Sequence, residues 1–450
     1  MAGRPFPDER RLIVAFQRLR SVLFLFSLAL LAAVAVPVGV RAQSPTEYDE
    51  NVRALMSHPA VRTAFNVIEE TDDRTMAELV ALTEIPAPPF QEEERGRAFL
   101  GMLEEAGVDS AWVDEVGNVI GLRRGTGNGE VFALAGHLDT VFPPGTDVSV
   151  RVRGDTLLAP GIADDTRGLV TVLAVLRAMN EADIRSDADI LFIGNVGEEG
   201  LGDLRGVKHL FREDGPGIDH YLSIDGTSAT RIVHMGLGSH RYRVTFQGPG
   251  GHSWGAFGLA NPAHALGRAI RYFQDGADPF TRGAAYPTSY NVGRIGGGTS
   301  VNAVPFESWM EVDMRSEGVE TLAGIDAIFQ AAMQSALEEE NRIRELGDPL
   351  TVEIDMIGDR PSGELALDDP YIKRAAAATR ALGLEPTYGR SSTDANTPLS
   401  LGIPAITTGG GGQAFGAHSL REWYRNEDGP IGIQRVLLIT LAQAGVAQAI

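Results

Sequence analysis

Short apolar segments that end at turn residues recur along the chain from about residue 130. The segments Glu130 to Ala135, Asp189 to Val196 and Tyr221 to Ile224 predict buried β-strands. Between the first two, apolar residues at helical spacing from Gly168 to Ala182 predict an amphipathic helix. Strands that alternate with helices are typical of an α/β fold with a largely parallel sheet.

The pattern changes near Gly236. From His240 to Gln247 apolar and polar residues alternate, which is typical of an antiparallel strand with one exposed face. The elements expected next are a helix at 261–273, strands at 289–295 and 307–315, a long helix at about 320–345 and a strand at 351–357. This β-α-β-β-α-β order is that of a small ferredoxin-like domain. We therefore predict an α/β domain of residues 43–235 and 359–450, with a mostly parallel central sheet, interrupted by an inserted α+β lid of residues 236–358.

The first 42 residues differ from the rest of the chain. Four arginines between residues 10 and 20 precede an almost purely apolar run at 22–36, and residues 40–42 resemble a small-residue cleavage site. This order predicts a signal peptide over residues 1–42 and a secreted or periplasmic mature chain without stable membrane insertion. A retained membrane anchor is the alternative, although so short an apolar run is marginal for spanning a bilayer.

Composition narrows the chemistry. The chain has 60 acidic and 39 basic residues and a net charge of −21, so its surface repels nucleic acid and we exclude that class of partner. It contains no cysteine. It therefore forms no disulfide, and a metal site would have to use His, Asp and Glu.

Acidic residues and histidines follow the predicted strands or stand in turns beside them. They are His137 with Asp139, Asp164 with Asp165, Glu198 with Glu199, Asp225, and His418. Because α/β sheets bind ligands outside the carboxyl ends of their strands, we expect these side chains to meet at one edge. Together they form the ligand set of zinc in a chain without cysteine. Two metals that share a carboxylate can activate water and polarise a carbonyl.

Each motif alone also has a purely structural explanation. His137 and Asp139 point to one side of an extended chain, so Asp139 could orient the imidazole, or His137 could be a surface residue in a capped turn. Asp165 can be explained as a helix N-cap, whereas Asp164 could bridge two cations. The two glutamates in the Gly197 turn could hold a metal and move a proton, or simply be solvated.

The five motifs, in this order, resemble those of the co-catalytic zinc exopeptidases and amidohydrolases, the family of carboxypeptidase G, peptidase T, the dipeptidases, acetylornithine deacetylase and succinyl-diaminopimelate desuccinylase. The resemblance covers almost all of the mature chain, including the lid. It implies two zinc ions per subunit, for which cobalt or manganese could substitute. The ligands that it implies are His137 and Asp225 at one zinc, Glu199 and His418 at the other, and Asp164 between them.

The resemblance also implies roles for residues that bind no metal. Asp139 would orient His137, and Glu198 would be the general base. In the lid, Gly250-Gly251-His252-Ser253 matches the motif whose histidine, in dimeric members, reaches the partner subunit's site and stabilises the oxyanion. A homodimer through the lid is therefore possible. An ordinary turn residue is the alternative for His252.

Two more lid residues, Asn302 and Arg315, stand where the family contacts polar groups or a carboxylate of the substrate. An exposed arginine on a strand is the alternative for Arg315. One stretch departs from the family pattern, because Thr166-Arg167-Gly168 replaces the Lys-Gly-Gly of many members.

These implications predict an exported dinuclear zinc metallo-exopeptidase, with a catalytic domain and a lid or dimerisation domain, that hydrolyses short peptides. Family members with Asp at the Asp225 position tend to be aminopeptidases or dipeptidases, and those with Glu tend to be carboxypeptidases or deacylases. An N-acyl-amino-acid amidohydrolase or a carboxypeptidase is the alternative on the same fold and metals. A metal-free binding protein is a remote alternative, which the intact ligand set disfavours.

Overall fold

The computed structural model of the protein describes residues 46–127 and 129–447. The predicted signal peptide, residues 1–42, lies outside these residues. In the described part of the chain, no helix combines the length and apolar character needed to cross a membrane.

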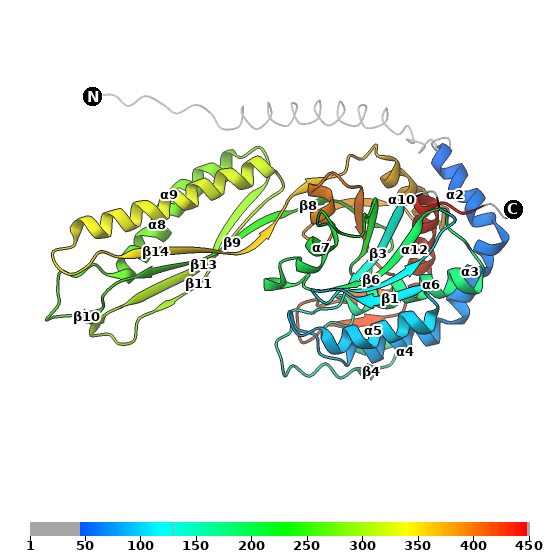
Figure 1. Ribbon diagram of the computed structural model, residues 1–450, viewed down its shortest axis with the longest axis horizontal. Coiled ribbons are helices and arrows are strands. Elements are labelled where there is room, and N and C mark those ends of the chain that lie inside the picture. The colour runs from blue at the N-terminus through cyan, green and yellow to red at the C-terminus, as the bar shows by residue number, and fades with distance from the viewer. Residues whose placement is uncertain (1–45, 128, 448–450) are drawn as a thin grey trace, which may run out of the picture. The chain divides into compact units, whose positions relative to one another are not determined.

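A nine-stranded sheet forms the centre of the larger domain (Figure 1). Its strands, from one edge to the other, are β1 (Ser110–Val113), β2 (Val119–Arg123), β6 (Asp189–Asn195), β3 (Val131–His137), β7 (His220–Ile224), β17 (Ala405–Thr408), β8 (Arg231–Gly236) and β15 (Gly363–Glu364), with β16 (Thr387–Ser391) also paired to β8. The four central strands, β6, β3, β7 and β17, run parallel. The predicted mostly parallel sheet is therefore confirmed.

Both faces of the central part of this sheet are buried because alternate residues of its inner strands enter different cores. In β3, Phe132 and Leu134 join one cluster, while Ala133 and Ala135 join the other. The helices of this domain are α2 (Glu47–Ser57), α3 (Pro59–Glu70), α4 (Asp72–Thr83), α5 (Glu93–Ala106), α6 (Thr166–Glu181), α7 (Arg205–Leu210), α10 (Pro370–Ala381), α11 (Asn396–Ser400) and α12 (Gly429–Ala444).

Helix α6 differs from the expected amphipathic helix, because every residue from Thr166 to Met179 is buried. It packs on β3 and is also covered by α3, α4 and α12, so none of its sides faces solvent. A second, four-stranded sheet joins two distant segments of the chain. It contains β4 (Arg151–Arg153), β5 (Thr156–Leu158), β18 (Gln413–Phe415) and β19 (Trp423–Arg425).

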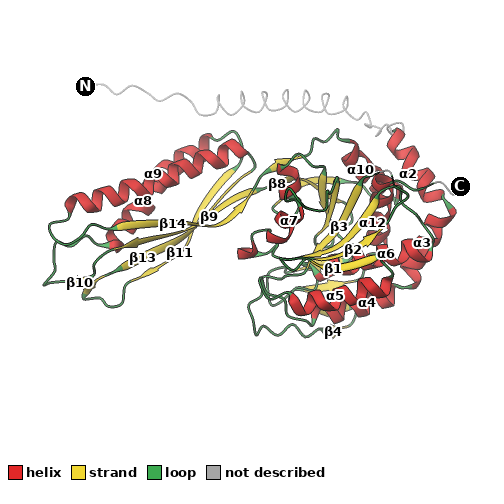
Figure 2. Cartoon of the chain, in the orientation of Figure 1, coloured by secondary structure: helices red, strands yellow, loops and turns green. Residues whose placement is uncertain are grey.

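The predicted lid elements form a separate α+β layer. They are β9 (Gly238–Gln247), α8 (Pro262–Gly283), β11 (Thr288–Gly297), β13 (Glu307–Ser316), α9 (Val319–Ile343) and β14 (Thr351–Arg360), with a short pair β10 (Gly251–His252) and β12 (Ala303–Val304). The sheet order β11-β13-β9-β14, antiparallel throughout, is the predicted ferredoxin-like arrangement. Helices α8 and α9 cover one face of this sheet (Figure 2).

This layer has its own hydrophobic core, in which Phe246, Phe273 and Phe329 are fully buried. Helix α8 continues past the predicted end at residue 273, because Ala277 and Phe280 go on packing against that core. The chain enters and leaves the lid through neighbouring strands of the large sheet, since β8 and β15 pair with Gly236 opposite Gly363.

Candidate active site

The candidate metal ligands lie where three parallel strands of the central sheet end. His137 is the last residue of β3, the turn with Glu198 and Glu199 follows β6, and Asp225 follows β7. Asp164 lies just before α6. The shared strand direction therefore brings these residues to one edge of the sheet.

Asp164 lies between two histidines that are far apart in the sequence. Its Oδ1 is 3.1 Å from Nε2 of His137, and its Oδ2 is 3.0 Å from Nε2 of His418. The same His418 nitrogen is 2.9 Å from Oε1 of Glu199. Ligand atoms of His137, Asp164 and Glu199 all lie within 4.8 Å of one another. Asp225 lines the same pocket as Asp164, Glu199 and His418, which has a volume of about 640 Å³.

This donor set fits the divalent metals that the sequence implies. Imidazole and carboxylate ligands suit zinc in a site without cysteine. The two oxygens of Asp164 face different histidines, as a carboxylate shared by two ions requires. The residues present can therefore hold two ions, with Asp164 between them.

Hydrogen bonds from backbone N–H groups to two buried acids hold this arrangement in place. Asp139 accepts the backbone N–H groups of Glu198 and Glu199 at 3.0 and 2.8 Å, and its own carbonyl is 3.0 Å from Nδ1 of His137. Asp165 accepts the backbone N–H of His137 and caps α6 through the N–H of Gly168, both at 3.0 Å. Asp139 thus lies where it can orient His137, and Asp165 does more than cap a helix.

The crowded carboxylates and histidines perturb one another's pKa values. Burial lowers the pKa of His137, but hydrogen bonds to Asp139 and Asp164 outweigh it and raise that pKa well above 6.5. Hydrogen bonds to Asp164 and Glu199 raise the pKa of His418 to about 10. Burial, and then the charge of Asp164, raises the pKa of Asp225 to about 7. In the metal-free protein at pH 7, the positive charges of the two protonated histidines therefore offset the negative charges of the neighbouring carboxylates.

Metal binding at pH 7 is expected to release about two to three protons, because histidines must be neutral and carboxylates ionised to bind metal. His137 and His418 both have raised pKa values and are protonated in the metal-free protein, and Asp225, with a pKa of about 7, is partly protonated. The affinity for zinc should then rise with pH. Titration calorimetry with zinc in buffers of different ionisation enthalpy would count the protons, and a heat that does not depend on the buffer would contradict this expectation.

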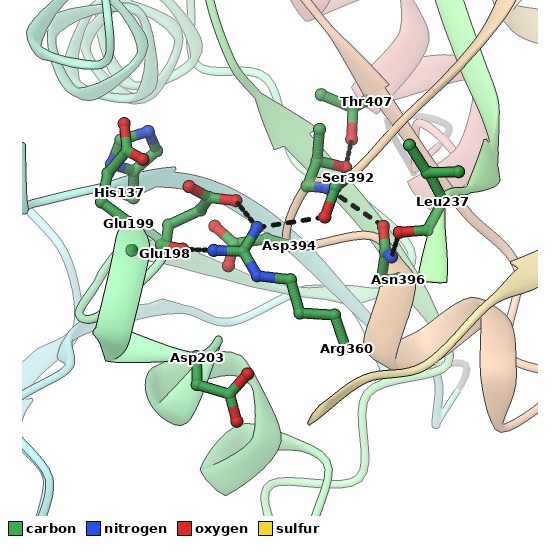
Figure 3. A network of polar contacts seen from close by, with 12 residues as sticks. His137, Glu198, Glu199, Asp203, Leu237, Arg360, Ser392, Asp394, Asn396 and Thr407 are labelled. Carbon is green, nitrogen blue, oxygen red and sulfur yellow. Dashed lines mark hydrogen bonds and ion pairs between the residues drawn. The ribbon is translucent and has the colours of Figure 1, made fainter. Parts of the chain in front are cut away.

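Arg360 is a site residue that the sequence analysis missed. Its Nη1 lies 3.0 Å from Oε1 of Glu198 and 3.1 Å from Oγ of Ser392, and its Nη2 donates to the Glu198 carbonyl. Figure 3 shows the guanidinium pointing between these partners, beside Asp394. Burial raises the pKa of Glu198 well above its ordinary range, and Arg360 opposes that rise. An arginine at the end of a strand carries no sequence signal for this role.

The three lid residues predicted to act at the site are not all brought to it. Arg315 lines the pocket, next to Arg241. His252 ends β10 and Asn302 directly precedes β12, so the two lie together beyond the far end of β9 (Figure 1), and neither lines the pocket. Nδ1 of the exposed His252 is 3.2 Å from the backbone N–H groups of Trp254 and Gly255, which leaves Nε2 to carry the proton.

Comparison with known proteins identifies the family. Residues 133–441 match the family described as Peptidase family M20/M25/M40. The chain is 28% identical to carboxypeptidase G2 of a Pseudomonas strain over 321 residues, 68% of this chain and 72% of that protein. It is 40% identical to a Pyrococcus abyssi protein named as a LysW-lysine/LysW-ornithine hydrolase, over 30% of this chain and only 36% of that protein.

Solved structures share the fold. Aminopeptidase PepT from Bacillus cereus superposes with a TM-score of 0.65 over 83% of this chain and 99% of its own, at 22% identity. The Saccharomyces cerevisiae dipeptidase Dug1p gives a TM-score of 0.67 over 85% and 98%, at 14% identity. At these identities the likeness concerns the fold, whereas the family match covers more than half of the chain. The chain belongs to peptidase family M20/M25/M40.

Proposed function

We propose that this chain is an exported, dinuclear zinc exopeptidase that hydrolyses short peptides. The observation that carries the proposal is the cluster of His137, Asp164, Glu199 and His418, with Glu198 next to it in the chain. Export rests on the leader pattern at residues 1–42. The aminopeptidase and dipeptidase structures that share the fold, and the aspartate at position 225, support a peptide substrate.

Two zinc ions, when bound, would supply the Lewis acidity that polarises the scissile carbonyl and lowers the pKa of the attacking water. Glu198 then takes a proton from that water and passes it to the leaving amine. Burial raises the pKa of the Glu198 carboxyl, so this group holds the proton more readily than an exposed glutamate would before passing it on. The contact with Arg360 fixes the position of the carboxylate. Asp139 holds the His137 imidazole and the turn with Glu198 and Glu199 in fixed positions relative to each other.

The charges in the pocket favour a second candidate, an N-acyl-amino-acid amidohydrolase or carboxypeptidase. Among the described residues that line the pocket, the acids are Asp164, Glu198, Glu199 and Asp225, and all have roles as ligand or base. No further acid is left there to bind a free amino terminus. Four arginines, at 231, 241, 315 and 360, line the same pocket. Arg315 contacts Asp313 through Nε at 2.8 Å, so its Nη atoms could bind a substrate carboxylate.

A matched substrate panel separates these candidates. Free dipeptides and tripeptides would be compared with their N-acylated counterparts, with and without a chelator and added zinc. Chelator-sensitive cleavage of the free peptides alone supports the exopeptidase. Cleavage of the acylated compounds alone assigns the amidohydrolase and keeps the site intact. A protein that binds no metal and cleaves neither set would instead be a binding protein on this fold.

His252→Ala is expected to lower kcat by about 10²-fold, as loss of one oxyanion donor does, and to leave the metal content unchanged. Because His252 does not line the pocket of its own chain, it could act only in the site of a second copy. Mixing the inactive His252→Ala and Glu198→Gln proteins should then restore activity in mixed dimers, since one of the two sites regains both groups. Loss of metal from His252→Ala would contradict this assignment.

A further inference from the structure

Two segments far apart in the chain supply Asp164 and His418, and the structure fastens them together. Strands β5 and β19 pair with Leu158 opposite Trp423, so residues 159–165 and the turn with His418 both lie beside the same small sheet. The strand pairing ends before either ligand is reached. The spacing between the two ligands therefore depends on contacts beyond the ends of these strands.

Glu422 makes those contacts. Its side chain accepts three backbone N–H groups of the Asp164 loop, from Gly161 at 2.8 Å, Ala163 at 2.9 Å and Asp164 at 3.1 Å. Only 1% of Glu422 is exposed. A buried carboxylate that accepts several backbone N–H groups fixes the path of the loop that donates them. A buried N–H group without an acceptor would raise the free energy of the folded protein.

The backbone of Glu422 closes the turn that directly follows His418, and the two turns share Ser419. The Glu422 N–H donates to the Ser419 carbonyl at 3.1 Å, and the Ser419 N–H donates to the Gly416 carbonyl at 3.0 Å. His418 lies inside the turn from Gly416 to Ser419 with φ of 62°, a conformation that residues other than glycine rarely adopt. Glu422 is therefore connected to the His418 turn through Ser419 and to the Asp164 loop through its carboxylate.

A second link connects the same regions from the other side. Arg167 is fully buried, and its Nε and Nη2 donate to the carbonyl of Gly410 at 3.1 and 2.8 Å. Arg167 follows the Asp164 loop, and Gly410 precedes β18. Arg167, which stands at the first glycine position of the family's Lys-Gly-Gly, thus holds the glycine loop beside the Asp164 loop.

We propose that Glu422 is a positioning residue that sets the distance between the bridging carboxylate of Asp164 and the imidazole of His418. This inference rests on the proposed function, because it needs metals at these two ligands. Glu422 acts through Asp164 and does not bind metal itself. A change at Glu422 should then weaken zinc binding and lower kcat with little change in KM, since the substrate-facing arginines are untouched.

The test uses the mature chain with Glu422→Gln, in which one oxygen becomes an NH2 group that cannot accept the loop N–H groups. Zinc affinity is measured by competition with a chromophoric chelator, and kcat, KM and the thermal midpoint of the chelated protein are measured beside it. We expect zinc binding about 10- to 100-fold weaker, as when a partner of a ligand is lost. If Glu422 had only a structural role, the substitution would lower the thermal midpoint of the chelated protein without changing its zinc affinity.

Glu340→Gln is the matched control. Glu340 is also a buried glutamate that accepts a backbone N–H, from Asn261 at 2.8 Å, but it lies in the lid and does not line the pocket. If Glu422→Gln does not fold, Glu422→Asp keeps the charge and withdraws both oxygens from the loop. A folded variant of either kind with wild-type zinc affinity overturns the inference. A wild-type protein that binds no zinc overturns the proposed function itself, and the inference with it.

Discussion

Glu198→Gln is expected to retain both metals and to lose about 10²- to 10⁴-fold in kcat. Glutamine keeps the shape of the side chain and still accepts a hydrogen bond from Arg360, but it cannot take a proton from water. Arg360, with a side chain only 5% exposed, would lose its charged partner. We therefore also expect the free energy of unfolding to fall by about 1–3 kcal/mol. Metal analysis and steady-state kinetics on the same preparation would measure both effects.

Glu78→Gln provides the control for this variant. Glu78 is another buried glutamate paired with a buried arginine, since Nη1 of Arg177 lies 2.9 and 2.8 Å from its two oxygens. The pair lies between α4 and α6 and does not line the pocket. Glu78→Gln should lose stability with kcat unchanged. Full activity in Glu198→Gln would show that the base lies elsewhere.

Asp164→Asn is expected to abolish binding at both metal sites. The asparagine carries no negative charge, so neither the ion beside His137 nor the ion beside His418 keeps its anionic shared ligand. Loss of a mere partner of a ligand weakens metal binding about 10- to 100-fold, so loss of a shared ligand should exceed that range. The activity should fall with it. Zinc content after gel filtration, measured for both sites, is the direct readout.

His418→Ala makes the comparison specific. His418 contacts Glu199 and one oxygen of Asp164, so its loss should remove one metal and leave the one held by His137 and Asp225. Two zinc ions in the wild type, one in His418→Ala and none in Asp164→Asn would establish the shared ligand. Equal zinc contents in the two variants would mean that Asp164 serves a single ion.

The grouping of site residues at the strand ends could be predicted because the apolar runs and the geometry of a parallel sheet both indicate the same edge. The apolar runs marked β3, β6 and β7, and a parallel sheet places the residues after such strands at one edge. His137, Glu199 and Asp225 could therefore be grouped from the sequence. The alternation in β9 likewise revealed the lid, because its polar residues face away from the core that Phe246 joins.

Residues that act through long-range contacts could not be found in this way. Glu422 lies 258 positions from the Asp164 backbone N–H that it accepts, and Arg360 lies 162 positions from Glu198. Nothing local distinguishes a buried partner of this kind from an ordinary surface charge. The burial of α6 on all sides was hidden for a similar reason, since α3, α4 and α12 complete its surroundings from elsewhere in the chain.

The pairing of Gly236 with Gly363 has a consequence for how this protein can vary. In connectivity the entire lid is the loop of a β-hairpin, and a hairpin can be closed by a few residues. Insertions whose ends lie this close together are readily gained, exchanged or lost without disturbing the host. Every candidate metal ligand lies outside the insertion, whereas Arg315 lies within it. Arg360, the last residue of β14, connects the insertion to Glu198. A lid that keeps this one contact can therefore change without altering the metal ligands.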